Sequence, residues 1–420
     1  MTTVPADAGR LYLDYAATTP VAPEVAARMA ACLQIDGAFG NPSSLHPWGV
    51  DAARLVDAAA EQVAALIGGA PEGVVWTSGA TESDNLAILG VGRFARERGR
   101  GNHVISARTE HAAVLGALEQ LEREGMEVTL LPPGPDGAVS VDQVDAALRD
   151  DTVLVSLMHV NNETGAVNDI AAIGDRLRHH PARFHVDAAQ SAGRLPLHVD
   201  QWGIDLLALS GHKLYGPKGV GALWVRRRPR VRLSPLLHGG GQQGGVRPGT
   251  LAPHLIAGMG AACALVQGEM AHEPDRLRGL RNRLRDQLVG LGAVQVNGQV
   301  DGSPHVLNVS IGCINGDALQ ADLGDLGVSA GSACSSSDQA ASHVLRAMGV
   351  PDALAHSTLR FSFGRWTTPE SVDVAGARVA AAAERLRALS PAWLRYRDGH
   401  SLDALYRRNA QPADASKEDE

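Results

Sequence analysis

The sequence predicts a layered α/β fold with two domains, and three observations support this prediction. The chain has 420 residues, which is more than one ordinary domain holds. Through about the first 250 residues, short apolar runs alternate with longer helical patterns. This alternation is typical of a mostly parallel sheet that is buried between helices. After about residue 255 the pattern changes, and a second, smaller α/β unit is expected there.

Seven segments of the first unit have the length and composition of strands. They are residues 73–78, 103–107, 127–132, 152–160, 183–188, 204–210 and 221–227. Alanine- and leucine-rich segments between several of them are long enough to be crossover helices. In such sheets ligands bind at the carboxyl ends of the strands, so the site is expected there.

The second unit begins with a helix over residues 274–291 whose leucines recur at helical spacing. We expect this helix to pack between the domains. Strands are predicted at 305–311, 326–331 and 358–364, and helices at about 316–325 and 370–389. The expected organisation is an N-terminal arm (1–20) packing on the small domain, a large domain (21–255), a small domain (256–400) and a tail (401–420) with a disordered end.

Composition excludes several classes of function. The net charge of −8 argues against a nucleic-acid partner, and we interpret the arginine-rich run 226–232 as a solvated face. The N-terminus has no signal pattern and no apolar run approaches a membrane span, so a cytoplasmic protein without a membrane partner is expected. The four cysteines have no zinc-binding spacing, so no metal is expected.

Lysine is scarce in this chain, which makes one lysine conspicuous. Only Lys213, Lys218 and Lys417 occur among 38 basic side chains. Lys213 lies in SGHK, directly after the strand predicted at 204–210. Arginine carries surface charge equally well but does not readily act as an amine nucleophile, so Lys213 is a candidate for amine chemistry.

Two further strand ends supply chemical groups that complement the amine of Lys213. After the first strand, the turn formed by residues 78–81 precedes a helix and suits a phosphate, although a plain helix cap by Thr81 or Ser83 is the alternative. At the end of the strand 183–188, Asp187 needs a cation or a protonated nitrogen as a partner, which could be a pyridinium or the cation of a structural ion pair. Together with Lys213, these are the parts of a pyridoxal-phosphate site. A dinucleotide site is disfavoured because no GxGxxG follows a first strand.

A histidine and a cysteine complete the candidates. His111 follows the strand 103–107 and suits ring stacking or proton transfer. Cys334 lies in GSACSSSD among small polar residues, which favours either a reachable thiolate or an inert surface cysteine. The other cysteines, Cys32, Cys263 and Cys313, have apolar neighbours and are interpreted as core residues.

In this order and spacing, the motifs resemble the NifS/IscS-type cysteine desulfurases of the class V aminotransferase family. The motifs are LDYAATTP (13–20), FGNPSS (39–44), TSGATESDNLA (77–87), TEHAAVL (109–115), MHVNNETG (158–165), HVDAAQS (185–191), SGHKLYGPKGVGAL (210–223), GSAC (331–334) and RFSFGR (360–365). The resemblance covers nearly the whole chain and is strongest to the housekeeping iron–sulfur branch. It implies the fold type I of pyridoxal-phosphate enzymes, with a mostly parallel seven-stranded sheet in the large domain.

The resemblance implies roles for named residues. Lys213 would form the Schiff base with pyridoxal 5'-phosphate, Cys334 would take the sulfur, and His111 would stack on the ring and assist acid/base steps. The other cofactor-binding residues would be Ala80, Thr81, Asn162, Asp187, Gln190, Ser210, His212 and Thr250. Asn41 and Arg360 would bind the substrate carboxylate. Thr250 would reach the phosphate of a neighbouring subunit, which implies a homodimer.

The implied activity is removal of sulfur from L-cysteine, giving L-alanine and a persulfide on Cys334. Sulfur acceptors such as an iron–sulfur scaffold, with which Cys334 would transiently share a cluster, are the implied partners; tRNA thiolation is a second destination. Alternatives are DNA phosphorothioation, nitrogenase maturation, or another class V enzyme such as a selenocysteine lyase or aminotransferase. Two departures from the family pattern are Pro248, in place of serine, and residues 339–342, which lack the usual proline.

Overall fold

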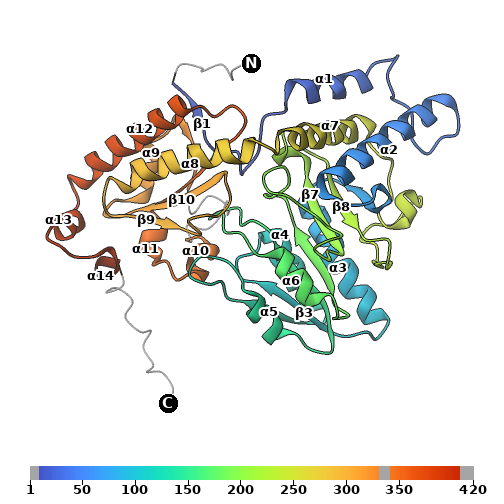
Figure 1. Cartoon of the computed structure of the whole chain (residues 1–420), viewed down its shortest axis with the longest axis horizontal. Coiled ribbons are helices and arrows are strands. Elements are labelled where there is room, and N and C mark those ends of the chain that lie inside the picture. The colour runs from blue at the N-terminus through green and yellow to red at the C-terminus, as the bar shows by residue number, and fades with distance from the viewer. Residues whose placement is uncertain (1–8, 331–340, 407–420) are drawn as a thin grey trace, which may run out of the picture.

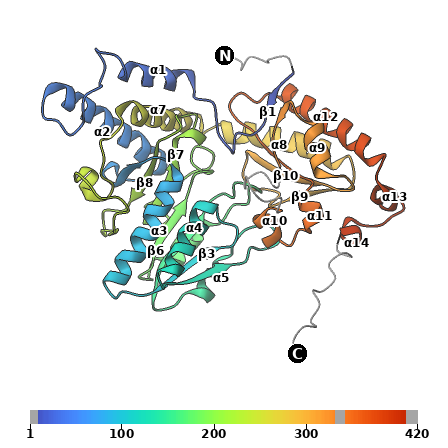
Figure 2. The same ribbon diagram turned by 180° about the vertical axis from the view of Figure 1, so that it is seen from behind.

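The computed structural model describes residues 9–330 and 341–406. The two larger sheets, each with its own helices, form two lobes that lie side by side (Figure 1), and the view from behind shows the same division (Figure 2). Within the described ranges, no helix combines the length and the apolar character needed to cross a membrane.

The large lobe contains a mixed, mostly parallel seven-stranded sheet in the order β2-β8-β7-β6-β5-β3-β4. The strands are β2 (Val74–Thr77), β3 (His103–Ala107), β4 (Glu127–Leu131), β5 (Thr152–Met158), β6 (Arg183–Asp187), β7 (Leu206–Ser210) and β8 (Gly221–Val225). Strand β8 runs antiparallel to both of its neighbours, β2 and β7, and the other strand pairs of this sheet are parallel. All seven strands predicted for this unit are confirmed, as is the mostly parallel sheet.

Helices cover both faces of the large sheet because successive strand residues point to opposite faces. On β3, for example, Ile105 packs in one apolar cluster and Val104 in the other. The first face is covered by α2 (Pro47–Ile67), α5 (Val141–Ala147), α6 (Ile170–Leu177) and α7 (Pro253–Glu269), with α1 (Pro23–Cys32) outside α7. The second is covered by α3 (Ala80–Glu97) and α4 (Ala112–Arg123). Short 3₁₀ turns occur at Pro71–Gly73, Gly211–Lys213 and Gln242–Gly245.

The small lobe contains a four-stranded antiparallel sheet in the order β12-β13-β10-β9. Its strands are β9 (Val294–Asn297), β10 (Val306–Ile311), β12 (Ser329–Ala330) and β13 (Thr358–Ser362). Near the N-terminus, β1 (Leu11–Tyr12) pairs in parallel with β11 (Leu326–Gly327). The helices of this lobe are α8 (Glu273–Val289), α9 (Gly316–Asp322), α10 (His343–Ala347), α11 (Asp352–Ala355), α12 (Pro369–Arg387), α13 (Pro391–Arg397) and α14 (Leu402–Tyr406).

The small sheet differs from the prediction in two respects. The strand expected at 326–331 is two short strands, because β11 pairs with β1 while β12 pairs with β13. The strands β1 and β9 were not predicted. Residues of β9 are mostly half-buried, and its alternation of valine with Gln295 and Asn297 is too short a signal to stand out.

Helix α8 packs inside the small lobe, so the expectation that it packs between the domains is wrong. Its leucines, including Leu277 and Leu284, join the apolar cluster of β10, β13 and α12. Conversely, α7 packs in the large cluster through Met259 and Cys263, although the expected boundary at 255 falls inside this helix. We therefore propose that the small domain begins at α8.

The leucine stripe of α8 predicts where stability is concentrated. Leu284 is fully buried, so Leu284→Ala should lower the free energy of unfolding by about 2–5 kcal/mol. Val289, at the end of the same helix, is 48% exposed, and Val289→Ala should change it by less than about 0.5 kcal/mol. Urea denaturation checks both values; equal effects of the two substitutions would contradict the assignment of α8 to a core.

Candidate active site

A cavity of about 480 Å³ opens at the carboxyl ends of β2, β6 and β7. Its lining residues are Ala17, Thr18, Ser78, Gly79, Ala80, Thr81, Glu82, Asp84, His111, Asp187, Ala189, Ser210, His212, Lys213, Lys218 and Gly219. Seven of the residues predicted for the site therefore lie around one cavity: Ala80, Thr81, His111, Asp187, Ser210, His212 and Lys213.

One end of the cavity is the turn from β2 into α3. Gly79 is the N-cap of α3 and no side chain caps this end of the helix, so the alternative of a plain cap by Thr81 or Ser83 does not hold. A helix N-terminus of this kind offers backbone N–H groups and a positive dipole end to a phosphate. The turn packs tightly on β8, where a Cβ at Gly221 would lie 2.6 Å from the Cα of Gly79.

An ion pair supports this turn from outside. Glu82 accepts a hydrogen bond of 2.7 Å from the backbone N–H of Ser78 and another of 2.7 Å from the guanidinium of Arg247. Burial alone would raise the pKa of Glu82, but the hydrogen bonds from Arg247 and Ser78 lower it below its ordinary value. Glu82 is therefore a carboxylate at neutral pH that ties the turn to the segment preceding Thr250.

His212, next to Lys213 in the sequence, also lines the cavity. Burial and the charges of Lys213 and Lys218 lower the pKa of His212 to about 4. The ring is therefore neutral at physiological pH, and its Nδ1 lies 3.1 Å from the hydroxyl of Thr18. A neutral ring offers a phosphate a hydrogen bond rather than a charge.

Asp187 and Lys213 face the cavity from neighbouring strands. Asp187 is the last residue of β6, is 8% exposed, and accepts a 2.8 Å hydrogen bond from the backbone N–H of Ala189. Lys213 ends the 3₁₀ turn after β7 and is half-buried. A buried carboxylate and an amine at adjacent strand ends are two of the groups that pyridoxal phosphate requires.

His111 is the N-cap of α4 and lines the same cavity. Its Nδ1 accepts a 3.1 Å hydrogen bond from the backbone N–H of Ala113, so the proton of the neutral ring is on Nε2. Burial lowers the pKa of His111, although the charge of Asp187 acts in the opposite direction. The ring is neutral and its orientation is fixed by the helix cap.

Five predicted residues do not line this cavity. Asn41 and Thr250 are exposed, and Asn162 is half-buried. The amide of Gln190 is buried, donates to the carbonyl oxygen of Ala16 at 2.8 Å and lies 3.3 Å from His305. The fifth residue is Arg360.

The guanidinium of Arg360 is already engaged. It is 6% exposed and donates hydrogen bonds of 2.8 Å to the carboxylate of Asp14, the hydroxyl of Ser329 and the carbonyl oxygen of Asn162. This arginine therefore links the N-terminal segment, the small sheet and the loop after β5.

The predicted cysteine lies outside the described residues, as part of the gap at 331–340. The other cysteines, Cys32, Cys263 and Cys313, are buried, which confirms their interpretation as core residues. Burial raises the pKa of Cys263 to about 12, so this thiol stays protonated.

Three charged residues that line the cavity were not predicted from the sequence: Glu82, Asp84 and Lys218. Lys218 is exposed and borders the cavity, and the scarcity of lysine in this chain was the available signal. Glu82 and Asp84 follow the turn on α3, where charged residues on a helix are ordinary. Only the packing of α3 on the sheet brings them to the cavity.

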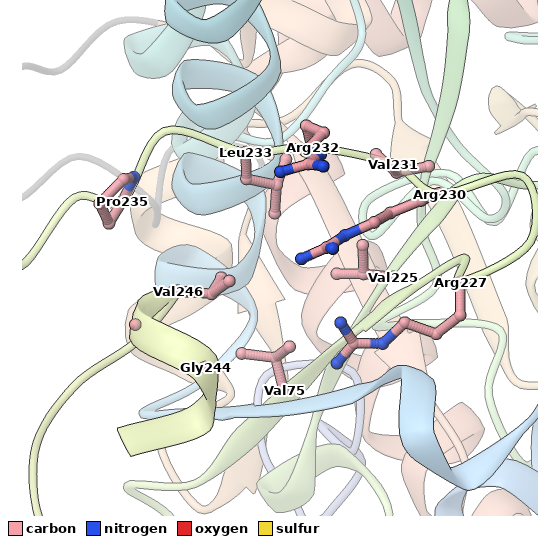
Figure 3. Close-up of a pocket in the computed structure, with 11 residues that line it drawn as sticks. Val75, Val225, Arg227, Arg230, Val231, Arg232, Leu233, Pro235, Gly244 and Val246 are labelled. Carbon is pink, nitrogen blue, oxygen red and sulfur yellow. The ribbon is translucent and has the colours of Figure 1, made fainter. Parts of the chain in front are cut away.

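A separate hollow of about 220 Å³ lies near the other end of the large sheet. Figure 3 shows Arg227, Arg230 and Arg232 around this hollow, together with Val75 and Val225. These three arginines are exposed, in agreement with the interpretation of 226–232 as a solvated face. Arg226 differs, because its half-buried guanidinium donates to the carbonyl oxygens of Val199 and Ile204.

Residues 11–374 match the family model described as aminotransferase class-V, and the chain belongs to this family. It is 54% identical over 397 residues to a protein of Pseudomonas putida (strain W619) named cysteine desulfurase IscS, covering 94% of this chain and 98% of that one.

Two solved structures extend the comparison. One, described as a NifS-like protein, has a TM-score of 0.82 and 32% identity over 90% of this chain and 99% of its own. Another, described as SspA in complex with cysteine, has a TM-score of 0.75 and 38% identity over 85% of this chain and 99% of its own. The predicted family, fold and cofactor are confirmed, since enzymes of this family depend on pyridoxal phosphate. The uncapped helix N-terminus, Asp187 and Lys213 fit that cofactor.

The Glu82–Arg247 pair predicts an effect on cofactor binding. Arg247→Ala should weaken the affinity of the cofactor-free protein for pyridoxal phosphate about tenfold, roughly 1.4 kcal/mol, because the turn loses the pair that holds it. Fluorescence titration measures this affinity.

The matched control is Arg283→Ala. This arginine forms a similar two-pronged pair with Asp373, at 2.6 and 2.7 Å, on the exposed surface of α8. The control should retain the affinity within about twofold. Equal affinities of the two variants would show that the Glu82–Arg247 pair does not support the site.

Proposed function

We propose that the protein is a cysteine desulfurase that uses pyridoxal phosphate to convert L-cysteine into L-alanine and a persulfide on Cys334. The observation that carries this proposal is the cavity shared by Lys213, Asp187 and His111 beside the uncapped N-terminus of α3. The identity of 54% to a protein named cysteine desulfurase supports the choice of reaction.

The bound cofactor supplies an electron sink that stabilises negative charge at the substrate α-carbon. In our proposal Asp187 holds the proton on the ring nitrogen, because a buried carboxylate stabilises a cation beside it. Lys213 would hold the cofactor, and its Nζ would accept the α-proton of the substrate. Ala80, Thr81, Ser210 and His212 bind the phosphate through N–H and hydroxyl groups.

The neutral ring of His111 supports a second acid/base role in the proposal. With Nδ1 engaged by Ala113, the Nε2–H is the group available to donate a proton in the cavity. Stacking of the ring on the cofactor uses its planar face and leaves that N–H free. Asn162 and Gln190 are proposed to contact the cofactor ring.

The sulfur transfer is assigned to Cys334. Its thiolate attacks the sulfur of the substrate, the carbon–sulfur bond breaks, and the electron pair remains with the three-carbon product, which leaves as alanine after protonation. Arg360 and Asn41 are proposed to bind the substrate carboxylate. The 2.8 Å contact of Arg360 with Asp14 supports this role, since the guanidinium is oriented by one carboxylate already.

The persulfide sulfur is proposed to pass to acceptor proteins, foremost an iron–sulfur scaffold, in the cytoplasm. The identity to a protein with IscS in its name supports this destination. The protein is proposed to act as a homodimer in which Thr250 of each subunit contacts the phosphate bound by the other. The exposure of Thr250 and its absence from the lining of its own subunit's cavity support this arrangement.

Substitutions of Lys213 and of Cys334 should have different effects on the cofactor band and on sulfide release. Lys213→Ala should lose both turnover and the visible absorption band of the bound cofactor, because the amine is its covalent anchor. Cys334→Ala should keep the band and lose sulfide release under reducing conditions, because only the sulfur acceptor is gone. Absorption spectra and a sulfide assay check both results; wild-type sulfide release by the Cys334→Ala protein would contradict the mechanism.

The homodimer predicts complementation between two inactive or weakened chains. A mixture of Lys213→Ala and Thr250→Ala chains, dissociated and reassociated, should contain mixed dimers with one site that has both residues intact. Cofactor affinity at that site should equal the wild-type value, while Thr250→Ala alone should bind more weakly. A monomeric mass in sedimentation, or no recovery in the mixture, would contradict the shared site.

A further inference from the structure

A cluster of buried polar groups lies beneath the cavity, between α3 and the sheet. His185 and Asp187 are two residues apart on β6 and therefore point to the same face of the sheet, the one that α3 covers. Asp84, on α3, faces His185 from above, with Oδ1 3.5 Å from Nε2. Ser156, on the neighbouring strand β5, lies beside His185.

The carboxyl group of Asp84 has no conventional partner. It is 1% exposed, and within residues 9–330 and 341–406 neither of its oxygens has a hydrogen-bond partner. An ionised carboxylate in such surroundings costs several kcal/mol, as a rough order. A protonated carboxyl costs far less, and its O–H then needs an acceptor.

His185 offers that acceptor. The imidazole is fully buried, and its Nδ1 lies 2.9 Å from the hydroxyl oxygen of Ser156. Its Nε2, which faces Asp84, likewise has no hydrogen-bond partner in the part of the chain that the structure describes. If Nδ1–H donates to Ser156, the Nε2 lone pair points at Asp84, and a small rotation of the carboxyl group shortens 3.5 Å to a hydrogen bond.

Burial favours the neutral form of this pair. Asp84 is surrounded by Asp187, Glu110 and Lys213 in addition to His185. Burial raises the pKa of Asp84, the neighbouring carboxyl groups of Asp187 and Glu110 act in the same direction, and Lys213 acts in the opposite one. Burial lowers the pKa of His185 to about 4. Both directions favour a carboxylic acid and a neutral imidazole over an ion pair.

We propose that Asp84 is a protonated acid that donates to neutral His185, and that this pair acts as a positioning element for Asp187. Because the pair carries no net charge, Asp187 keeps its negative charge for the ring nitrogen without a second carboxylate beneath it. Asp187 also accepts the N–H of Ala189, whereas Asp84 has no such donor, so the charge resides on Asp187. The inference rests on the proposed role of Asp187.

Protonation of Asp84 is tested on the cofactor-free protein. A carboxyl that stays protonated in the folded state and ionises in the unfolded state makes folding less favourable as pH rises above about 4, the unfolded pKa. Asp84→Asn removes this effect, so the unfolding equilibrium constant of the wild type relative to the variant should rise with pH, by up to about tenfold per unit. A ratio that is constant from pH 4.5 to 7 would overturn the proposal.

The control for this measurement is Asp169→Asn. Asp169 is an exposed N-cap of α6 whose side chain accepts the N–H of Ala172, and asparagine preserves such a cap. The unfolding equilibrium constant of the wild type relative to the Asp169→Asn variant should stay constant from pH 4.5 to 7. This measurement involves no turnover. Its result can therefore contradict the protonation of Asp84 while desulfurase activity is observed, and a lack of activity would not affect the stability result.

The positioning role is tested on the loaded enzyme with two substitutions of Asp84. Asp84→Asn replaces one neutral donor by another, so the cofactor affinity should stay within about twofold of wild type and the pH midpoint of the visible cofactor band should not move. Asp84→Leu removes the donor and should weaken affinity about tenfold and move the midpoint. A tenfold shift with Asp84→Asn would indicate an ionised Asp84, and an unmoved midpoint with Asp84→Leu would indicate a purely structural residue; either overturns the proposal.

Discussion

The parallel pairing of β5, β6 and β7 is the constraint on which the site depends. Asp187 pairs with Met158 on one side and with Ala208 on the other, so the ends of these strands lie at one edge of the sheet. The chain can therefore bring Asp187 and Lys213 to one cavity although they are distant in sequence. A shift of one residue in β6 would turn Asp187 to the opposite, apolar face of the sheet.

The same sheet explains why polar groups are buried below the cavity. Most strand residues pack in the two apolar clusters, yet the face under α3 also holds His185, Ser156 and the carboxyl of Asp84. These buried polar groups contribute less to the stability of the fold than apolar residues would at the same positions. Neutral pairing limits this cost, so one net negative charge can remain at the end of β6, where the proposed chemistry uses it.

The sequence predicts the large sheet well because buried parallel strands are continuous apolar runs bounded by polar turns. It predicts the small lobe less well. The leucine stripe of α8 indicates which face is buried but not against what, and the split of 326–331 depends on pairing with β1, more than 300 residues away.

The candidate site was likewise predicted only in part from the sequence. Lys213, Asp187 and His111 could be predicted because each lies at or shortly after the end of a strand, and the strand ends converge. Asp84 could not, because its partner His185 is about 100 residues away, and one charged residue within the helical pattern of α3 carries no signal of burial. Nor does any spacing indicate that Arg360 contacts Asp14.

The central claim is that a lysine-anchored cofactor site delivers sulfur to one particular thiol. Intact-protein mass spectrometry after one equivalent of L-cysteine, without reductant, tests it most directly. The account predicts a gain of one sulfur atom per chain, located by peptide mapping on Cys334 and absent from the Lys213→Ala protein. Alanine formed without added sulfur on the protein, or sulfur on Cys32, Cys263 or Cys313 instead, would contradict it.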